Sequence, residues 1–377
     1  MKNNTSMGMK FKHFLHSEAL VSFLSSLLAI FVGLLFGFIV ILIANPSNAL
    51  EAFSRLITAG IADPVQLGKV TYYATPIILT GLSVGFAFKT GLFNIGAPGQ
   101  FIVGAFVAIY IGVKWTFLGS FQWVVALIGA GIAGGIWALV PGVLKAYRNV
   151  NEVIASIMMN YIGMSAVNFA IKNTVYNNLK NQTMAVAETA ILPKWGLDKL
   201  LPNSIANSGF IIAILIAIVM YIVLNKTTFG YELKACGHNA NAAKYAGISD
   251  KRNIMLSMVI AGILAGIGGG LLYLAGAGKY IEVVDQLANE GFNGIPVALL
   301  GLSNPIGTIF SGIFFAYLTV GGARIQTLGY TSQIVDIIVS CIVYFSAFGM
   351  IFKLFIKKFI NRKGVDNNAN ADAGGEK

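Results

Sequence analysis

The sequence predicts an all-α polytopic membrane protein with about ten transmembrane helices, some of them short or interrupted, in two related halves. Composition is the first observation: 56% of the 377 residues are hydrophobic and 11% are charged, against about 25% charged residues in ordinary soluble domains. With 15 Asp and Glu residues in the whole chain, a soluble protein of this size would lack the charged surface that it needs. Long apolar runs, some interrupted by Gly, Pro and Asn, are the second observation.

Ten apolar segments are candidate spans, because a helix of about 20 apolar residues crosses about 30 Å of hydrocarbon. They are residues 20–44, 70–88, 98–113, 121–141, 153–171, 208–225, 254–275, a pair of short spans within 292–321, and 333–352. If both termini are cytoplasmic, 17 of the 26 Lys and Arg residues fall on the inner side, as the positive-inside rule requires. The net charge of +11 is then a signal of topology and requires no nucleic-acid partner.

We expect three parts along the chain. Residues 1–19 form a cytoplasmic N-terminal segment, 20–352 form the transmembrane domain, which includes a cytoplasmic loop at 226–253, and 353–377 form a cytoplasmic tail. The tail is basic at first and is expected to be disordered beyond about Gly364, where it becomes polar and rich in Gly and Ala. The first apolar run is longer than the roughly 7–15 residues of a signal-peptide core, so we expect a retained helix.

Two segments, residues 91–106 and 291–315, interrupt their apolar runs with Gly, Pro and Asn, which break or cap helices. They resemble each other, since each has a Phe-Asn pair near a Gly and, beyond a Pro, two glycines five positions apart. Paired interruptions in the two halves of a transporter indicate a central substrate path. Close helix packing through small residues is the alternative interpretation.

The longest inner loop, residues 227–253, has features of a docking segment. Gly237 and Gly247 bracket the Ala-rich stretch His238–Ala246, in which Asn239 or Asn241 can cap a helix. Such a helix would be about 14 Å long, which is too short to be stable alone. It therefore needs a surface to pack on, either that of a partner or that of its own chain.

The sequence offers no catalytic site and no metal site. Cys236 and Cys341 form no CxxC or metal-ligand spacing, and the chain has no GxxxxGK[ST] motif for ATP. Asp336 is the one carboxylate well inside an apolar run; it is either a pathway group or a partner of Arg324. Glu152 is expected at the N-terminal end of the fifth span. We therefore expect no bound cofactor, and energy supplied by another subunit or by an ion gradient.

Four motifs give the chain a resemblance to permease subunits of ABC importers of the ribose/galactose-permease superfamily, in its nucleoside branch. In the family's order they are FNIGAPGQ (93–100), NEVIASIMMNYI (151–162), the loop pattern between residues 230 and 248, and GFNGIPVALLG (291–301). Pro98 is a departure, because the family usually has Glu there. It removes a carboxylate and puts any role carried over to that position in doubt.

The resemblance implies an ATP-driven importer of nucleosides in a bacterial-type plasma membrane. The implied partners are a second permease, identical or paralogous, two ATP-binding subunits that use the ATP, an extracellular substrate-binding lipoprotein, and membrane lipid. The implied ATPase-coupling residues are Glu232, Ala235, Gly237, His238, Asn239, Ala243 and Gly247. The alternatives are an ABC permease for a monosaccharide such as ribose and, in a different class, an ion-coupled secondary transporter. The shortage of carboxylates within spans weighs against the second alternative.

A neutral nucleoside needs a path lined by aromatic rings, which stack on bases, and by amides, which meet base edges. The interrupted segments and the motif at 151–162 supply both kinds of side chain. Our candidate lining residues are Phe93, Asn94, Gln100, Asn160, Phe292 and Asn293. For each aromatic residue, ordinary packing is the alternative.

Overall fold

The computed structural model describes residues 18–348, 351–356 and 358, and the chain divides into two compact units. The first unit contains residues 1–54 and 325–377, and the second contains residues 55–324. The expectations for residues 1–17 and for the tail from 359 onward lie outside the described residues. Each unit is described by itself below.

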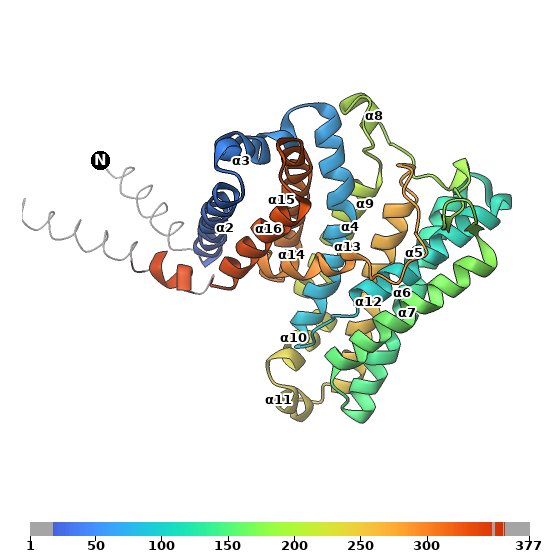
Figure 1. Cartoon of the computed structure of the whole chain (residues 1–377). Helices are drawn as coiled ribbons and strands as arrows, with labels where there is room; N and C mark the ends of the chain where they lie inside the picture. Colours follow the sequence, from blue (N-terminus) through green and yellow to red (C-terminus); the bar gives the residue numbers. More distant parts are fainter. Residues whose placement is uncertain (1–17, 349–350, 357, 359–377) are drawn as a thin grey trace, which may run out of the picture. The chain divides into compact units, whose positions relative to one another are not determined.

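The first unit is built on two helices, α2 (Glu18–Ala44) and α16 (Ser332–Ala347), with the short 3-10 helices η1 (Pro46–Asn48) and η5 (Gln326–Leu328) (Figure 1). Gly33 and Gly37 of α2 lie against α16, where an added Cβ would come 2.5 Å from the Cα of Ile342 and 2.8 Å from a methyl carbon of Ile338. Two small residues four apart let helix backbones approach closely in a membrane. The α2–α16 pair therefore depends on these glycines.

The second unit is a helical bundle (Figure 1). Its elements begin within α3 (Ala49–Thr58), which contains the boundary between the units. They continue as η2 (Ala59–Ile61), α4 (Pro64–Lys89), α5 (Ala97–Lys114), η3 (Thr116–Phe121), α6 (Gln122–Arg148), α7 (Glu152–Thr174), β1 (Tyr176–Asn177), β2 (Gln182–Thr183), η4 (Glu188–Ala190), α8 (Leu197–Leu200), α9 (Gly209–Lys226), α10 (Thr228–His238), α11 (Ala240–Tyr245), α12 (Asp250–Tyr273), α13 (Asn289–Phe292), α14 (Gly294–Leu300) and α15 (Pro305–Ile325).

Helix α12 occupies the centre of this bundle and packs on α4, α5 and α6. The contact with α6 is backbone against backbone: an added Cβ on Gly266 would lie 2.3 Å from the carbonyl oxygen of Ala130, and one on Gly262 would lie 2.3 Å from that of Gly134. Small residues are what allow helices to come this close. Any side chain at these positions would force α12 and α6 apart.

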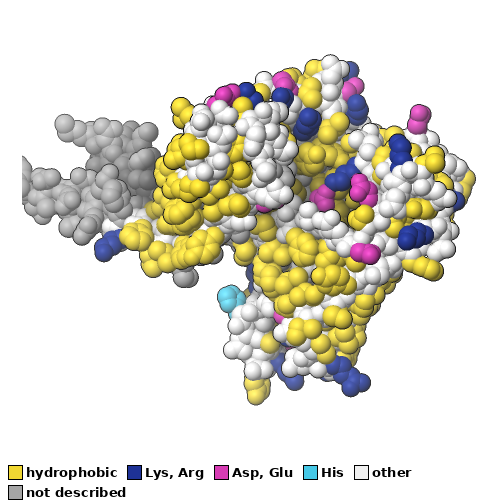
Figure 2. Space-filling view, in the orientation of Figure 1, with side chains coloured by type: hydrophobic (Ala, Val, Ile, Leu, Met, Phe, Trp, Pro, Cys, Tyr) yellow, Lys and Arg dark blue, Asp and Glu magenta, His cyan; other side chains and the backbone are white. Residues whose placement is uncertain are grey.

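The opposite face of α6 is apolar and exposed. Ile128, Ile132 and Ile136, spaced four residues apart, are 57%, 56% and 62% exposed, and Figure 2 shows hydrophobic side chains covering a broad zone of the second unit, with charged side chains gathered toward the ends. In a soluble protein the large apolar residues of a helix would face inward. This arrangement, with small residues inside and large apolar residues outside, is that of a helix facing lipid.

Eight helical segments among the described residues are long and apolar enough to cross a membrane, and they confirm the predicted all-α polytopic class. They involve α2, α4, α5, η3 with α6, α7, α9, α12 and α15 with η5. The prediction of two short spans within 292–321 is wrong, because this region holds the single long helix α15 preceded by the short helices α13 and α14. Seven residues of α14 extend about 10 Å, which does not cross 30 Å of hydrocarbon. The last predicted span, 333–352, includes residues 349 and 350, which are not described.

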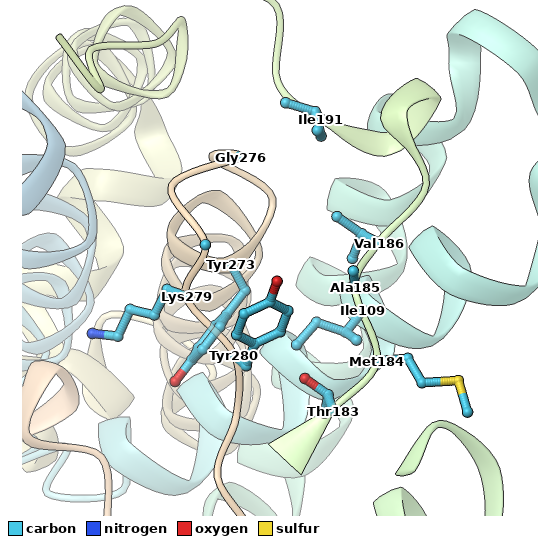
Figure 3. A pocket seen from close by; sticks show the side chains of 11 residues that line it. Ile109, Thr183, Met184, Ala185, Val186, Ile191, Tyr273, Gly276, Lys279 and Tyr280 are labelled. Carbon is cyan, nitrogen blue, oxygen red and sulfur yellow. The ribbon is translucent and has the colours of Figure 1, made fainter. Parts of the chain in front are cut away.

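Two connecting segments of the second unit face each other at one end of α12. The strands β1 and β2 pair antiparallel, with Tyr176 opposite Thr183, and Gln182 bridges to Glu282 in the segment after α12. The backbone N–H of Thr183 donates to the carbonyl of Ile281 at 3.0 Å. Together these segments enclose a half-open cavity of about 130 Å³ (Figure 3).

The substitution Gly266→Ala tests the packing of α12 on α6. We expect it to cost about 1–3 kcal/mol of stability, the usual cost of overpacking, because the new methyl group meets a backbone carbonyl that cannot rotate away. Thermal unfolding of the detergent-solubilised protein measures the effect. Gly131→Ala is the matched control, since its Cβ would meet movable Ile267 and Ile263 side-chain atoms at 3.2 and 3.4 Å. Equal unfolding temperatures for the two variants would contradict the assignment.

Candidate functional site

The two interrupted segments meet inside the second unit. After α4 ends at Lys89, residues 90–96 turn back into the bundle, and α5 begins at Ala97, which is fully buried. Gly291 of α13 lies directly on the start of α5, where an added Cβ would come 2.4 Å from the Cα of Pro98. The segments with similar sequences are therefore in contact.

Pro98, the departure from the family motif, suits its position. It lies in the first turn of α5, where a helix leaves N–H groups unpaired in any case and the fixed φ of proline is compatible with helix formation. The residue is buried, so a carboxylate in its place would need a partner in order to remain ionised. Proline removes that requirement and leaves a flat surface for Gly291.

Asn94 and Gln100 form a reciprocal pair of amides at this helix break. Asn94 Nδ2 donates to Gln100 Oε1 at 2.9 Å, and Gln100 Nε2 donates to Asn94 Oδ1 at 2.9 Å. Asn94 also donates to Ser83 Oγ of α4 at 3.1 Å and accepts from the N–H of Gly96 at 3.2 Å. Both amides are almost fully buried, so their hydrogen bonds hold the turn before α5 in place.

Asn160 of α7 supports the same turn from the other side. Its Oδ1 accepts from the backbone N–H of Gly99 at 2.9 Å, and its Nδ2 donates to the carbonyl of Ile95 at 2.9 Å. The N–H of Gly99 belongs to the first turn of α5 and has no partner within the helix. Asn160 therefore acts as a cap supplied by a neighbouring helix.

Sequence reasoning missed Ser156, which lies four residues before Asn160 on α7. Its hydroxyl is buried and has no hydrogen-bond partner among the described residues, and its Cβ would lie 3.2 Å from a Cβ added to Gly96. The i, i+4 spacing of two polar residues within NEVIASIMMNYI was the available signal, because such residues share one helix face.

The other three candidate lining residues are half-buried. Phe93 stacks on Phe88, with ring centroids 5.1 Å apart and planes at 14°. Both rings, like Ile295 of α14, pack against a buried cluster that includes Val84 and Ala97. Phe292 and Asn293 lie at the break between α13 and α14. No described residue forms a hydrogen bond with the Asn293 side-chain amide. The lining role of all six residues remains a prediction.

The inner loop forms two helices where one was expected. The predicted helix His238–Ala246 is present as the shorter α11, and α10 precedes it. Asn239 caps α11, since its Oδ1 accepts from the N–H of Ala242 at 3.0 Å. Gly247 ends the loop helix with a φ of +81°, a conformation that favours glycine.

The predicted coupling residues divide into a buried and an exposed set. Ala243 is buried, and Glu232 accepts from Asn253 Nδ2 of α12 at 3.3 Å. Ala235 and Gly237 are half-buried, whereas His238, Asn239 and Gly247 are exposed. The exposed set flanks α11, whose Tyr245 is 95% exposed, while the buried set attaches the loop to the bundle.

Gly237 joins this loop to the helix break. An added Cβ on Gly237 would lie 2.4 Å from the carbonyl oxygen of Lys89 and 3.0 Å from the backbone nitrogen of Gly91. Gly91 itself has a φ of +74° and begins the turn that carries Phe93 and Asn94. The inner loop and the candidate site are therefore in direct backbone contact.

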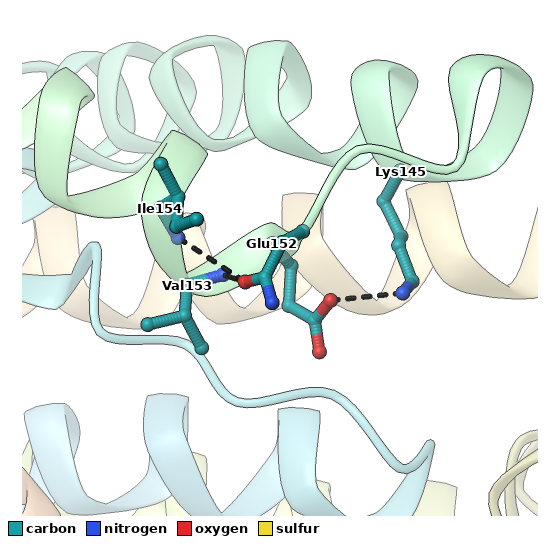
Figure 4. Close-up of polar contacts among 5 residues, drawn as sticks. Lys145, Glu152, Val153 and Ile154 are labelled. Carbon is teal, nitrogen blue, oxygen red and sulfur yellow. Dashed lines mark hydrogen bonds and ion pairs between the residues drawn. The ribbon is translucent and has the colours of Figure 1, made fainter.

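Glu152 and Arg324 have ion-pair partners, and Asp336 is exposed. Glu152 is the first residue of α7, as predicted, and its carboxylate lies 2.9 Å from Lys145 Nζ (Figure 4). Arg324 lies 3.9 Å from Asp63. Asp336 is exposed on α16. Within the described part of the chain, no group of three or more His, Cys, Asp or Glu side chains is placed to hold a metal ion.

Comparison with known proteins identifies relatives over nearly the whole chain. The family described as "branched-chain amino acid transport system / permease component" matches residues 66–351. The chain is 36% identical over 341 residues to the guanosine ABC transporter permease protein NupP of Bacillus subtilis, covering 90% of this chain and 97% of NupP. It is also 36% identical over 341 residues to the nucleoside ABC transporter permease protein NupB of Lactococcus lactis, covering 88% of this chain and 92% of NupB.

More distant relatives include a sugar permease and a second nucleoside permease. The glucose ABC transporter permease protein TsgB13 of Haloferax volcanii is 28% identical over 347 residues, covering 89% of this chain and 90% of TsgB13. The guanosine ABC transporter permease protein NupQ comes from Bacillus subtilis, as NupP does. It is 26% identical over 253 residues, covering 65% of this chain and 77% of NupQ. No solved structure matches the chain.

The substitution Asn160→Ala tests the support of the helix break. It leaves the buried N–H of Gly99 without its partner, at a cost of about 1–3 kcal/mol, and also removes the part-buried bond to the carbonyl of Ile95. We expect a clear fall in the unfolding temperature of the solubilised protein. Asn173→Ala, on the same helix, is the matched control, because Asn173 is exposed and donates only to Phe169 of its own turn at 2.8 Å. A fall of the same size in both variants would contradict the capping role.

Proposed function

Because the chain belongs to the permease family described for branched-chain amino acid transport systems, we propose that it is the transmembrane permease of an ATP-driven ABC importer that takes up nucleosides. The relatives NupP and NupB, named for guanosine and nucleoside transport, support this cargo at 36% identity over most of both chains. TsgB13, named for glucose transport, is less similar at 28%. A monosaccharide is therefore the second candidate cargo.

The contact between Gly237 and Gly91 is the observation that carries the proposal. A permease without its own ATP site must receive force from a partner at its cytoplasmic surface and transmit it to the substrate path. Packed elements with discrete arrangements transmit such changes. Here α11 presents the free surface, α10 carries Gly237, and Gly237 touches the turn that holds Phe93 and Asn94.

The proposed assembly has a second permease, two ATP-binding subunits and an extracellular substrate-binding lipoprotein. The occurrence of two permease relatives, NupP and NupQ, in one organism supports a second permease. ATP hydrolysis takes place in the ATP-binding subunits, which contact the exposed residues of the inner loop. In this scheme both termini face the cytoplasm, and the assembly lies in the plasma membrane.

The proposed path is uncharged, and the half-buried residues at the two helix breaks line it. Phe93 and Phe292 offer ring faces on which a base stacks, and Asn293 offers an unpaired amide for a base edge. Asn94, Gln100 and Asn160 have their hydrogen bonds within the protein in this structure. They are buried behind the wall of the path, and they hold its shape without needing to exchange partners.

Uptake of labelled guanosine, uridine, ribose and glucose by cells that contain the complete transporter tests the function. We expect saturable nucleoside uptake that is lost when the Walker lysine of the ATP-binding subunit is replaced and that survives an uncoupler in cells with a maintained ATP level. Uptake that survives loss of the ATPase but stops with the uncoupler would contradict the ABC assignment. Uptake of sugars alone would favour the monosaccharide alternative.

The substitution Gly237→Val tests the coupling contact. Its side chain would meet the backbone of Lys89 and Gly91, so we expect the helix break to shift and uptake to fall at least about tenfold, with ATP hydrolysis by the assembled complex retained. Ser249→Val, an exposed change in the same loop, is the control. Loss of uptake and of hydrolysis in equal proportion would contradict a coupling role for Gly237.

The substitution Asn293→Ala tests the lining. Loss of one hydrogen bond to the cargo corresponds to about a fivefold change, so we expect the rate of guanosine uptake at saturating lipoprotein to fall by about this factor, with normal protein stability. Asn225→Ala is the control, because Asn225 is an exposed amide at the end of α9. Unchanged uptake and substrate preference in Asn293→Ala would remove Asn293 from the path.

A further inference from the structure

The half-open cavity of about 130 Å³ in the second unit lies apart from the helix breaks (Figure 3). It contains none of the lining residues predicted from the sequence. Its walls are the segment that follows β2 and the loop that follows α12, and its base is formed by the ends of α5 and α12. The lining residues are Ile109, Thr183, Met184, Ala185, Val186, Ile191, Tyr273, Gly276, Gly278, Lys279 and Tyr280.

Apolar side chains and ring faces form the larger part of the cavity wall, and the one charged side chain that lines it, Lys279, is paired. Figure 3 shows the ring of Tyr280 between Tyr273 and Ile109, with Val186 on the facing segment. The Lys279 side chain points away from these rings in the same view, and its ammonium group pairs with Glu290. A neutral ligand with an apolar face therefore fits these walls better than an ion does.

Hydroxyl groups supply the polar atoms of the cavity. The hydroxyl of Tyr280 makes no hydrogen bond to other described residues, so it is available to a ligand as a donor or acceptor. The Tyr273 hydroxyl points away from the facing segment, to the side where Lys279 lies (Figure 3). Thr183 Oγ1 accepts from the backbone N–H of Ile281 at 3.3 Å and keeps its own hydrogen for donation. This combination of ring faces with a few hydroxyls matches a heterocyclic base, which has a flat face and donors and acceptors at its edge.

The size of the cavity limits the ligand to a ring. An engineered protein cavity of about 150 Å³ holds one benzene molecule, so about 130 Å³ accommodates one six-membered ring of a base and leaves the rest of the nucleoside at the open side. The open side permits this, since Gly276 and Gly278 place no side chain at the rim. Both have a φ near +70°, a conformation that favours glycine.

The cavity lies at the end of α12 opposite to the inner loop. Helix α12 begins at Asp250, directly after α11, and ends at Tyr273, which lines the cavity. Its 24 residues extend about 36 Å, which is enough to cross the hydrocarbon. With α11 on the cytoplasmic side, the cavity opens on the outer side, where cargo arrives.

We propose that this cavity is an outer receiving site that takes the base ring of a nucleoside before it enters the path. The inference rests on the proposed function, because it assumes nucleoside cargo and an inward-facing α11. The Tyr280 ring provides the stacking surface, and the Thr183 hydroxyl meets the edge of the base. Because stacking requires a flat ring, the site accepts the base of the cargo and does not accept a free sugar.

Photolabelling of the purified complete transporter with 8-azidoguanosine tests the site directly. We expect labelled peptides from residues 183–191 or 273–280, protected by excess guanosine and not by excess ribose. Ala185→Trp, which fills the cavity from an exposed position, should reduce labelling at least about fivefold, and Tyr280→Ala should do the same through loss of stacking. Leu179→Trp, at the 96% exposed tip of the β1–β2 hairpin, is the control and should label like the unmodified protein.

The outcomes separate this inference from the proposed function. Guanosine uptake by the unmodified transporter, together with labelling outside these peptides or unchanged labelling in Ala185→Trp, would overturn the receiving site alone. Absence of all nucleoside uptake would overturn the proposed function. If Ala185→Trp raised the lipoprotein concentration needed for half-maximal uptake and left labelling unchanged, the cavity would bind a side chain of that partner, which also overturns the proposal.

Discussion

An interrupted helix inside an apolar bundle exposes backbone N–H and C=O groups that no water satisfies, and the candidate site depends on how the protein satisfies them. Each such group costs several kcal/mol if it is left unpaired in hydrocarbon. Here side-chain amides take the place of water: Asn160 binds the N–H of Gly99 and the carbonyl of Ile95, while Asn94 binds the N–H of Gly96. The break in the chain can exist inside the bundle because one amide comes from the turn itself and the other from the neighbouring helix α7.

The same constraint links the break to the inner loop. Its turn needs glycine at residue 91, where φ is positive, and the absence of a side chain there lets Gly237 of α10 approach backbone to backbone. The other interrupted segment uses the same device, since Gly291 lies on Pro98 and a Cβ added to Gly294 would lie 2.5 Å from the backbone of Thr80. Contacts this close leave little free volume, so a displacement of one element displaces the next. The glycines thus place the loop and the helix break in direct backbone contact.

Much of the fold could be predicted from the sequence because membrane spans are local features. A run of about 20 apolar residues forms a helix in lipid whatever its neighbours are, and caps such as Asn239 act within one turn. The prediction failed for residues 292–321, where length alone does not distinguish two short spans from α13 and α14 followed by the single long helix α15. That choice depends on whether a broken segment finds partners in the bundle, and Thr80, whose hydroxyl donates to the carbonyl of Glu290 at 3.1 Å, is such a partner.

The sequence by itself determined the solvent, the helical class and the family, through composition, apolar runs and motifs that are all contained in short stretches. Tertiary structure decided which amides are buried and already paired and which, like Asn293, remain free. It also decided that Gly237 meets Gly91 and that Tyr280 and Thr183 share a cavity. The physical reason is distance along the chain: Gly99 and Asn160 are separated by 61 positions and Thr183 and Ile281 by 98, and only packing of the helices brings such groups within hydrogen-bonding distance.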